Sequence, residues 1–428
     1  MIIGGIFIRL LLAPFFAHPY DVYYFYVVGQ NIASGRWSPW ALMLPYSYSY
    51  FLFAIPATLL FNAVSVFIGP TVISMSSLNP ILDPGPQWGI TVVPGLLYDF
   101  LLKIPLIASD AIIAVLVYRL ASRQKNNEKL ALTAAMLWFL NPLTIWISSG
   151  WGTMDTLPTL FTVLALYLAL ENKFVYSGVS IAVGMSLKYY PLVLAFPLLL
   201  IAYRRGGRKA SLLVLTGLCL TSLVLFLPNL SRVVHNFAFT SSVPFISGIQ
   251  YSGLSIWTAI RVIFPSFTLW YFPTIFAGVL MIVVYYWTWK KKTSDDICVV
   301  AAFFALPIAV LLLTYGFVGE NFFVWLLPFG AILALNSLSK RLFWLLSLIV
   351  LFSSITDSLL PYYMLPMAPW IGNYLVRALL IAAPYRVSSG SEIVQGLTFG
   401  KIFLSSLAVV TASVIMFSSF TWPRNHKS

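Results

Sequence analysis

The sequence predicts an all-α protein, a polytopic membrane helical bundle with about 12 transmembrane helices. Of its 428 residues, 60% are hydrophobic and only 9% are charged, whereas soluble domains average about 45–50% apolar and about 25% charged residues. The apolar residues form long unbroken runs, not the short alternating segments of a membrane β-barrel. We therefore expect residues 1–428 to form a single integral membrane domain.

The first apolar run covers residues 2–16. It has no charged leader before it and no small-residue cleavage site, so we expect a retained helix and not a removed signal.

The net charge of +13 comes from basic residues whose positions indicate the topology. Fifteen of the 25 Lys and Arg residues lie in five short clusters between apolar runs, and short basic loops mark the cytoplasmic side of a membrane. The clusters lack the interleaved aromatic residues of a nucleic-acid-binding surface, so we expect no nucleic-acid partner. They occupy residues 119–129, 204–209, 290–292, 340–341 and 424–427.

If every cluster is cytoplasmic, the chain crosses the membrane an even number of times between neighbouring clusters. The outside loops then begin at His18 and recur further along the chain. They fall near residues 150–155, 188–191, 228–256, 316–322 and 360–400. Residues 331–428 supply the C-terminal transmembrane helices.

Two stretches need a special interpretation. The run of residues 46–70 is long enough to span, but a crossing there would place the cluster at 119–129 outside. We interpret it as a re-entrant or juxtamembrane part of the first outer loop, with Pro56 as the break. Residues 174–187 and 192–203 are each short for a span. They form either two short helices that meet at residues 188–191 or one span that contradicts this topology.

Six polar residues fall at the same predicted edge of the membrane, although none of them belongs to the basic clusters that define the topology. An ionisable residue at membrane depth is costly unless it is paired or functional. The agreement therefore predicts a polar site on the outer, non-cytoplasmic side. The six residues are Asp21, Asp155, Glu320, Lys188, Arg232 and His235.

Each candidate has a simpler structural alternative. Asp21 and Asp155 could each cap the helix that follows, and Lys188 could extend its ammonium to the interface. Glu320 precedes a Phe-Phe-Val-Trp stretch that could belong to an aromatic interfacial belt. For Arg232 and His235, which lie in an outer loop, the alternative is simple solvation.

Lys103 and Asp110 are seven residues apart and therefore lie near one face of a helix. Either they pair, or Lys103 lines the outer cavity while Asp110 is buried with a partner that the sequence does not identify.

Several motifs of known chemistry are missing from the sequence. It has no P-loop, no glycine fingerprint for dinucleotides, no HExxH and no paired-cysteine metal site. We therefore expect no ATP-driven work and no cofactor, and a divalent metal is not indicated.

Six segments in fixed order across residues 1–330 resemble the GT-C superfamily of membrane glycosyltransferases, which use polyprenyl-phosphate sugars as donors. The similarity is greatest to multispanning archaeal and bacterial members and to the GPI mannosyltransferase group. It implies a catalytic module within residues 1–330. The segments are HPYDVYYFY (18–26), KIPLIASD (103–110), NPLTIWISSGWGTMD (141–155), SLKYYPLVLAFP (186–197), YSGLSIW (251–257) and ENFFVWLLPF (320–329).

The resemblance also implies roles for individual residues. The family's aspartate in the first outer loop acts as catalytic base and corresponds to Asp21, while Asp155 and Lys188 correspond to donor-binding or acceptor-binding positions. Many relatives carry paired acids in the first loop, whereas Asp21 has no acidic neighbour. Relatives often have Gln at the position of Thr153. We place the remaining candidates, His18, Lys103, Arg232, His235 and Glu320, in the same binding set.

The chemistry of such a transfer suits this set of residues. A glycosyl phosphate already carries a good leaving group, so the enzyme needs one base for the acceptor hydroxyl and cations for the phosphate. A single displacement inverts the anomeric carbon. The expected partners are a polyprenyl-phosphate-linked sugar donor, a lipid-linked or glycan acceptor, and membrane lipids. We expect a hexose to be transferred, mannose before other hexoses.

The sequence leaves two other functions open. A polytopic transporter or lipid flippase also has broken helices and a polar cavity, but its charges should lie near the bilayer midplane and its halves should repeat. The candidates here gather at one rim, and the sequence shows no repeat. A ligase that moves a whole glycan from a lipid carrier to another acceptor would share the fold.

Overall fold

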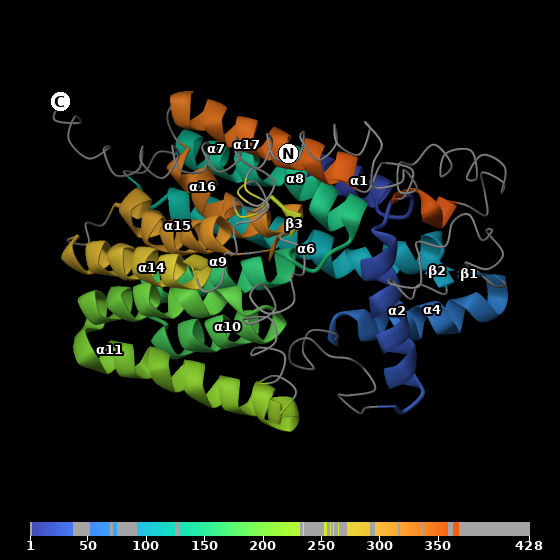
Figure 1. The fold of residues 1–428 in the computed structure, drawn as a ribbon, viewed down its shortest axis with the longest axis horizontal. Coiled ribbons are helices and arrows are strands. Elements are labelled where there is room, and N and C mark those ends of the chain that lie inside the picture. Colours follow the sequence, from blue (N-terminus) through green and yellow to red (C-terminus); the bar gives the residue numbers. More distant parts are fainter. Residues whose placement is uncertain are drawn as a thin grey trace.

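The computed structural model describes most of the first 367 residues. The described residues are 2–36, 52–68, 72–74, 92–124, 128–231, 234, 252–254, 257, 260, 264, 272–291, 296–315, 317–334, 337–357 and 363–367. Most of its helices run roughly along the long axis of the molecule, whereas α2 crosses that direction steeply (Figure 1). The predicted all-α class is confirmed, since the described strands are only two or three residues long.

The α-helices are α1 (Ile2–Leu12), α2 (Pro19–Ala33), α4 (Ala54–Ile68), α6 (Leu96–Ala121), α7 (Glu128–Phe139), α8 (Pro142–Ile145), α9 (Thr156–Leu170), α10 (Phe174–Leu187), α11 (Ala195–Phe226), α14 (Phe272–Lys290), α15 (Ile297–Thr314), α16 (Leu327–Leu333) and α17 (Ser337–Asp357). A π-helix, η1 (Trp146–Trp151), follows α8, and short 3₁₀-helices cover η2 (Tyr190–Leu194), η3 (Leu227–Asn229), η4 (Glu320–Trp325) and η5 (Leu365–Met367). The strands β1 (Val72–Ser74) and β2 (Val92–Pro94) pair antiparallel, and β3 (Ser252–Gly253) pairs parallel with β4 (Phe317–Val318).

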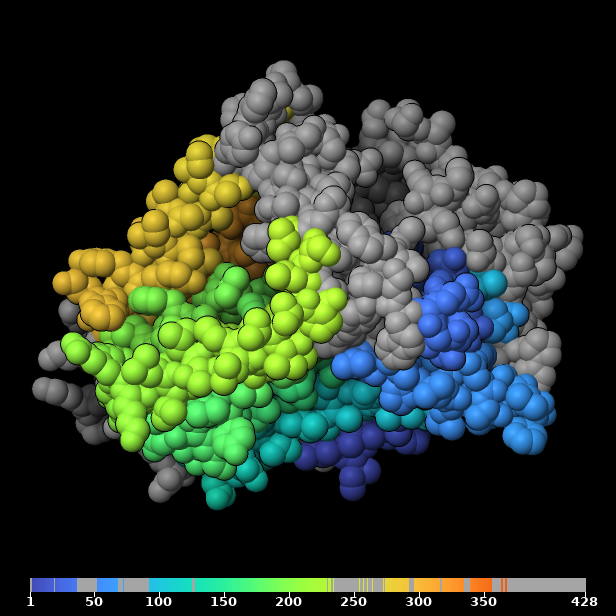
Figure 2. Space-filling view, turned by 90° about the horizontal axis from the view of Figure 1, so that it is seen from below, coloured from blue at the N-terminus to red at the C-terminus, as the bar shows by residue number. Residues whose placement is uncertain are grey.

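The protein is an integral membrane protein. In the described part of the chain, three helical stretches are long and apolar enough to cross a membrane: Leu96–Ala121, Tyr190–Phe226 and Ile297–Thr314. The pair Glu128–Phe139 and Pro142–Trp151, bent by 44°, would be a fourth. The outer surface of α11 (Figure 2) exposes Leu220, Leu223 and Val224, as a lipid-facing surface should. The total of twelve crossings and the division at residue 330 stay predictions.

The structure tests the predicted break at Pro56 and the arrangement of residues 174–203, whereas the re-entrant path of residues 46–70 stays a prediction. Pro56 does not break the chain; it lies in the first turn of the continuous helix α4, where a proline costs no intrahelical hydrogen bond. The expected break at Pro56 is therefore wrong. Residues 174–203 form two helices that meet at a break, because α10 ends at Leu187 and η2 begins at Tyr190. Within α11, Gly206 and Gly207 are non-helical, so the chain turns at the basic cluster 204–209.

The interior has two main apolar clusters, and both use α6. The larger involves α6 to α11 and α15 to α17, and the smaller involves α2, α4 and α6. Met154 and Leu187 belong to the smaller cluster, and each directly precedes a candidate site residue, Asp155 or Lys188. The candidate site therefore lies beside the packing between α2, α4 and α6.

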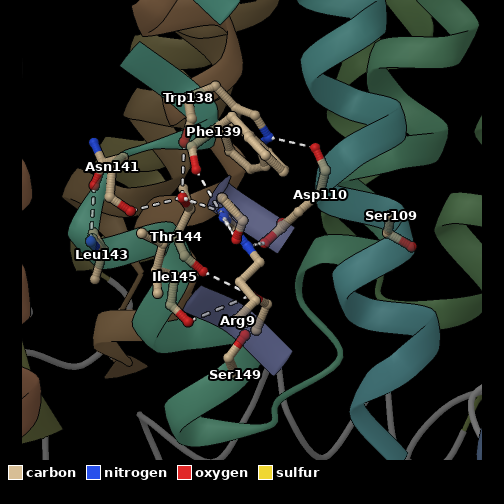
Figure 3. A network of polar contacts seen from close by, with 12 residues as sticks. Arg9, Ser109, Asp110, Trp138, Phe139, Asn141, Leu143, Thr144, Ile145 and Ser149 are labelled. Atoms are coloured by element: carbon tan, nitrogen blue, oxygen red, sulfur yellow. Dashed lines mark hydrogen bonds and ion pairs between the residues drawn. The ribbon is translucent and has the colours of Figure 1, made fainter. Parts of the chain in front are cut away.

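A buried ion pair attaches α1 to this core (Figure 3). Arg9 Nε lies 2.8 Å from Asp110 Oδ2, and both side chains are fully buried. Arg9 also donates to the carbonyl of Phe139 at 2.8 Å and to Thr144 Oγ1 at 3.2 Å. The partner of Asp110 is thus Arg9, and the alternative pairing of Lys103 with Asp110 is wrong.

Candidate functional site

Asp21 lies in the first turn of α2, where its carboxylate contacts side chains instead of capping the helix. The N-cap residue of α2 is His18, which makes no side-chain cap hydrogen bond. Trp151 Nε1 donates to Asp21 Oδ2 at 2.6 Å, and His18 Nδ1 lies 3.2 Å from the same oxygen. The Asp21 side chain is 31% exposed, so a substrate can reach it.

The charge of Asp21 is stabilised by its neighbours. Burial raises the pKa of the Asp21 carboxyl, but His18, the hydrogen bond from Trp151 and the positive charge of Lys188 lower it by more. The net result is a pKa below the ordinary aspartate value, so the group is ionised at neutral pH. Asp21 and Lys188 lie at the same end of the molecule, because Trp151 binds Asp21 while Thr153, two residues further on, binds Asp155, the partner of Lys188.

Asp155 is the centre of a second, buried cluster. It directly precedes α9 but makes no cap hydrogen bond, and it is fully buried. Its Oδ1 accepts from Lys188 Nζ at 2.6 Å and from Trp325 Nε1 at 2.7 Å. Its Oδ2 accepts from Asn321 Nδ2 and from Thr153 Oγ1, both at 2.5 Å. Because a carboxylate has about four acceptor sites, Asp155 has no capacity left for a substrate proton.

Lys188 directly follows α10, with an extended backbone, and its side chain points into the protein. Its side chain is only 8% exposed, so it does not extend to the interface. Its Nζ lies 4.4 Å from the ring centroid of Phe322 and 5.3 Å from that of Trp325, a cation–π arrangement. Tyr190 stacks on Trp325 at 4.1 Å. Phe322 and Trp325 therefore enclose Lys188, which the interfacial-belt alternative does not explain.

One turn of the chain connects the two carboxylates. It follows the π-helix η1, and its Gly152 has a φ of +82°, a conformation that glycine adopts without steric cost. Trp151, on one side of Gly152, donates to Asp21, and Thr153, on the other, donates to Asp155. The turn at Gly152 thus directs the side chains on either side of it, Trp151 and Thr153, to two different carboxylates.

Four predicted residues have other surroundings or lie outside the described part. Glu320 is 3% exposed and accepts from Ser353 Oγ at 3.0 Å, so it faces α17. Lys103 is fully buried and donates to the main-chain carbonyls of Ala13, at 2.8 Å, and Phe16; it does not line an outer cavity. Arg232 and His235 lie outside the described residues.

Asn321 and Trp325 were not predicted as site residues, although both bind Asp155. The segment Glu-Asn-Phe-Phe-Val-Trp could have indicated both residues together, because residues four apart on a helical stretch lie near one another. The sequence does not show which face of η4 turns inward. Only the charge of Glu320 makes that residue the candidate in this segment.

The site and the basic clusters lie at opposite ends of α9. Asp155 directly precedes this helix, and Glu171, directly after it, forms an ion pair with Arg123. Fifteen helical residues separate them by about 22 Å. The structure thus brings Asp21, His18, Asp155 and Lys188 to the end opposite this basic cluster, as the topology predicted. Which membrane face this end occupies stays a prediction.

Among the residues that the structure describes, no three or more His, Cys, Asp or Glu side chains come together in a way that could hold a metal ion.

Comparison with known proteins links the chain to the GPI pathway proteins. The family of the GPI transamidase subunit PIG-U matches residues 87–277. GPI mannosyltransferase 1 of Saccharomyces cerevisiae is 22% identical over 181 residues, 42% of each chain. The enzyme of that name from Candida albicans is 28% identical over 93 residues, 21% of this chain and 23% of the relative.

These matches confirm the predicted resemblance to GT-C membrane glycosyltransferases. The aligned parts span less than half the length of the curated relatives. The PIG-U match contains Lys103, Asp155 and Lys188, whereas Asp21 and Glu320 lie outside it. The matched region therefore includes Asp155, Lys188 and Thr153 of the buried cluster, but neither Asn321 and Trp325 nor the exposed carboxylate of Asp21.

Proposed function

We propose that the protein transfers a hexose, mannose in the first place, from a polyprenyl or dolichyl phosphate to a hydroxyl of a lipid-linked or glycan acceptor. The active site would face the non-cytoplasmic side. One observation carries the proposal: an accessible, ionised Asp21 lies at the same end of the bundle as the buried pair of Lys188 and Asp155. The similarity to proteins named GPI mannosyltransferase 1 supports mannose as the sugar.

In the proposed reaction, Asp21 takes the proton of the acceptor hydroxyl while the hydroxyl oxygen attacks the anomeric carbon. The bond from that carbon to the phosphate oxygen breaks, and its electron pair leaves with the lipid phosphate. The attack from the opposite side inverts the anomeric carbon. A positioned base of this kind contributes roughly 10²–10⁴-fold to the rate.

The cations would serve the leaving phosphate. Lys188 is held in place by Asp155 and by the ring of Phe322, so its charge is preorganised, which is what stabilisation of a developing negative charge requires. His18 lies beside Asp21 and would face the same phosphate. Arg232 and His235 remain the proposed outer part of this binding set.

The test compares Asp21→Asn with the control Glu171→Gln. Glu171 is a comparably exposed carboxylate, at 36%, and it also has an ion-pair partner, but at the other end of α9. Membranes that contain each full-length variant are assayed for transfer from labelled dolichyl-phosphate mannose to an endogenous glycolipid acceptor. We expect at least about 100-fold loss for Asp21→Asn and little change for Glu171→Gln. If Asp21→Asn keeps more than half of the activity, Asp21 is not the base.

A second candidate function is a non-catalytic subunit that binds a lipid-linked glycan. The match to the GPI transamidase subunit PIG-U favours it. In that case the purified wild-type protein would transfer no sugar from any polyprenyl-phosphate donor, yet a glycolipid would copurify with it. Asp21→Asn would then reduce the bound glycolipid and not a rate, which separates the two functions.

A further inference from the structure

We propose that Lys103 is a positioning residue that fixes Asp21 relative to Asp155, by holding the α1–α2 connection against the turn at Gly152. This inference rests on the proposed function, since it concerns the same site. It assigns Lys103 no contact with the substrate.

The first part of the argument is what Lys103 binds. Lys103 projects from α6, and its Nζ donates to the carbonyls of Ala13 and Phe16. Both carbonyls belong to the connection between α1 and α2, and Phe16 is five residues before Asp21. The amide of His18 in turn donates to the carbonyl of Trp151 at 2.8 Å. The segment that leads into Asp21 is therefore fixed from two directions.

The second part is the contact between Lys103 and the Gly152 turn. A Cβ atom on Gly152 would lie 2.6 Å from Lys103 Cε, which is closer than two carbon atoms can approach. The side chain of Lys103 thus occupies the space that the glycine leaves open. Gly152 stands between Trp151, which binds Asp21, and Thr153, which binds Asp155. One lysine side chain is consequently in contact with the supports of both acids.

The third part is the buried carboxylate of Asp99. Asp99 is one helical turn before Lys103 and fully buried, and neither of its carboxylate oxygens has a hydrogen-bond partner within the described structure. It interacts electrostatically with Lys103. An isolated ammonium in an apolar interior is strongly disfavoured, so the carbonyls of Ala13 and Phe16, with the carboxyl group of Asp99 one turn away, are the polar groups that accommodate Lys103. Sequence reasoning did not single out Asp99.

The test uses two independent ways to disturb this contact. The double variant Lys103→Met/Asp99→Asn removes the ammonium and the carboxyl group together, so that neither is left buried without the other. Gly152→Ala keeps Lys103 but displaces it. Gly35→Ala is the matched control, because Gly35 has a φ of +80° but no atom within 4 Å of an added Cβ. Asp21→Asn is included to test the proposed function in the same assay.

We expect the double variant and Gly152→Ala to lower kcat of mannosyl transfer by at least about tenfold, because a displacement of about 1 Å can cost roughly 100-fold in rate. The KM for the donor should change by less than about threefold, since Lys103 does not touch it. Hydrogen exchange of the full-length protein in detergent should become faster at residues 13–18, while the exchange of α9 and α10 stays unchanged. Gly35→Ala should leave both readouts as in the wild type.

The outcomes separate the two proposals. Wild-type kcat and wild-type exchange at residues 13–18 in the double variant would overturn the role of Lys103, even if Asp21→Asn is inactive. A raised KM with unchanged kcat would make Lys103 a binding residue and also overturn it. Full transfer by Asp21→Asn would instead overturn the proposed function, and the exchange measurement would still show whether Lys103 holds the segment.

Discussion

Replacing Asp155 by Asn should destabilise the protein strongly, although the two side chains have almost the same shape. Each oxygen of Asp155 faces two donors: Lys188 and Trp325 on one side, Asn321 and Thr153 on the other. The amide group of an asparagine would have to point its NH₂ toward one of these pairs. Turned toward Lys188 and Trp325, the NH₂ faces two groups that can only donate; turned the other way, it faces the NH₂ of Asn321. In both orientations Lys188 also loses the negative charge that compensates it.

The magnitude follows from these contacts. Breaking a buried ion pair by removing one partner costs about 3–5 kcal/mol, because the other charge stays buried. The donors that face the new NH₂ add a penalty of about 1–3 kcal/mol for each group left unpaired. Asp155→Asn should therefore lower the free energy of unfolding by at least about 4 kcal/mol. The double variant Asp155→Asn/Lys188→Met should be less destabilised than Asp155→Asn alone, because it contains no lone charge.

Thermal unfolding in detergent, followed by circular dichroism, measures the three variants against the wild type. Lys188→Met alone completes the double-mutant cycle. A change of less than about 1 kcal/mol for Asp155→Asn would refute the reasoning. So would additive single effects, because the argument requires Asp155 and Lys188 to act as a pair.

Two further predictions concern the other charged groups. Arg9→Met should destabilise by about 3–5 kcal/mol, since it leaves Asp110 buried and unpaired, and Arg9→Met/Asp110→Leu should recover much of this loss in the same unfolding assay; a double variant as unstable as the single would contradict it. Trp151→Phe removes a hydrogen bond that lowers the pKa of Asp21, so the acid limb of the pH–rate profile should move to higher pH. The lowered pKa also implies that the stability contributed by Asp21 is present above the ordinary aspartate value, about 3.9, and is lost as the pH falls through the lower folded-state value. An acid limb in Trp151→Phe identical to that of the wild type would show that the indole does not stabilise the carboxylate.

The position of the site could be predicted because membrane topology depends on simple counting. Once the basic clusters are assigned to one side, Asp21, Asp155 and Lys188 fall on the other, whatever the details of helix packing. The structure brings these three together at one end. Their different surroundings could not be predicted, because the exposure of Asp21 and the four hydrogen bonds to Asp155 depend on neighbours from distant parts of the chain.

The contacts that were missed are those that depend on helix rotation and on distant pairing. Arg9 and Asp110 are 101 residues apart, and no local pattern pairs them. The charge of Lys103 predicts a place in a polar cavity, yet its ammonium donates to main-chain carbonyls. A proline interrupts a helix interior, which predicts a break at Pro56, but Pro56 lies in the first turn of α4, and the sequence alone does not show where that helix begins.

The π-helix η1 has a consequence for how this region tolerates insertions and deletions. Its hydrogen bonds connect residues five apart instead of four, as in the bond from the amide of Gly152 to the carbonyl of Ile147. It therefore accommodates one residue more than an α-helical turn. Removing a single residue between 146 and 150 would therefore restore a regular α-helical turn and leave the indole of Trp151 pointing in nearly its present direction. A regular α-helix that kept the extra residue would instead rotate the indole by about 100° about the axis, away from α2. The wide turn thus lets the chain hold one more residue without losing the contact between the indole and Asp21.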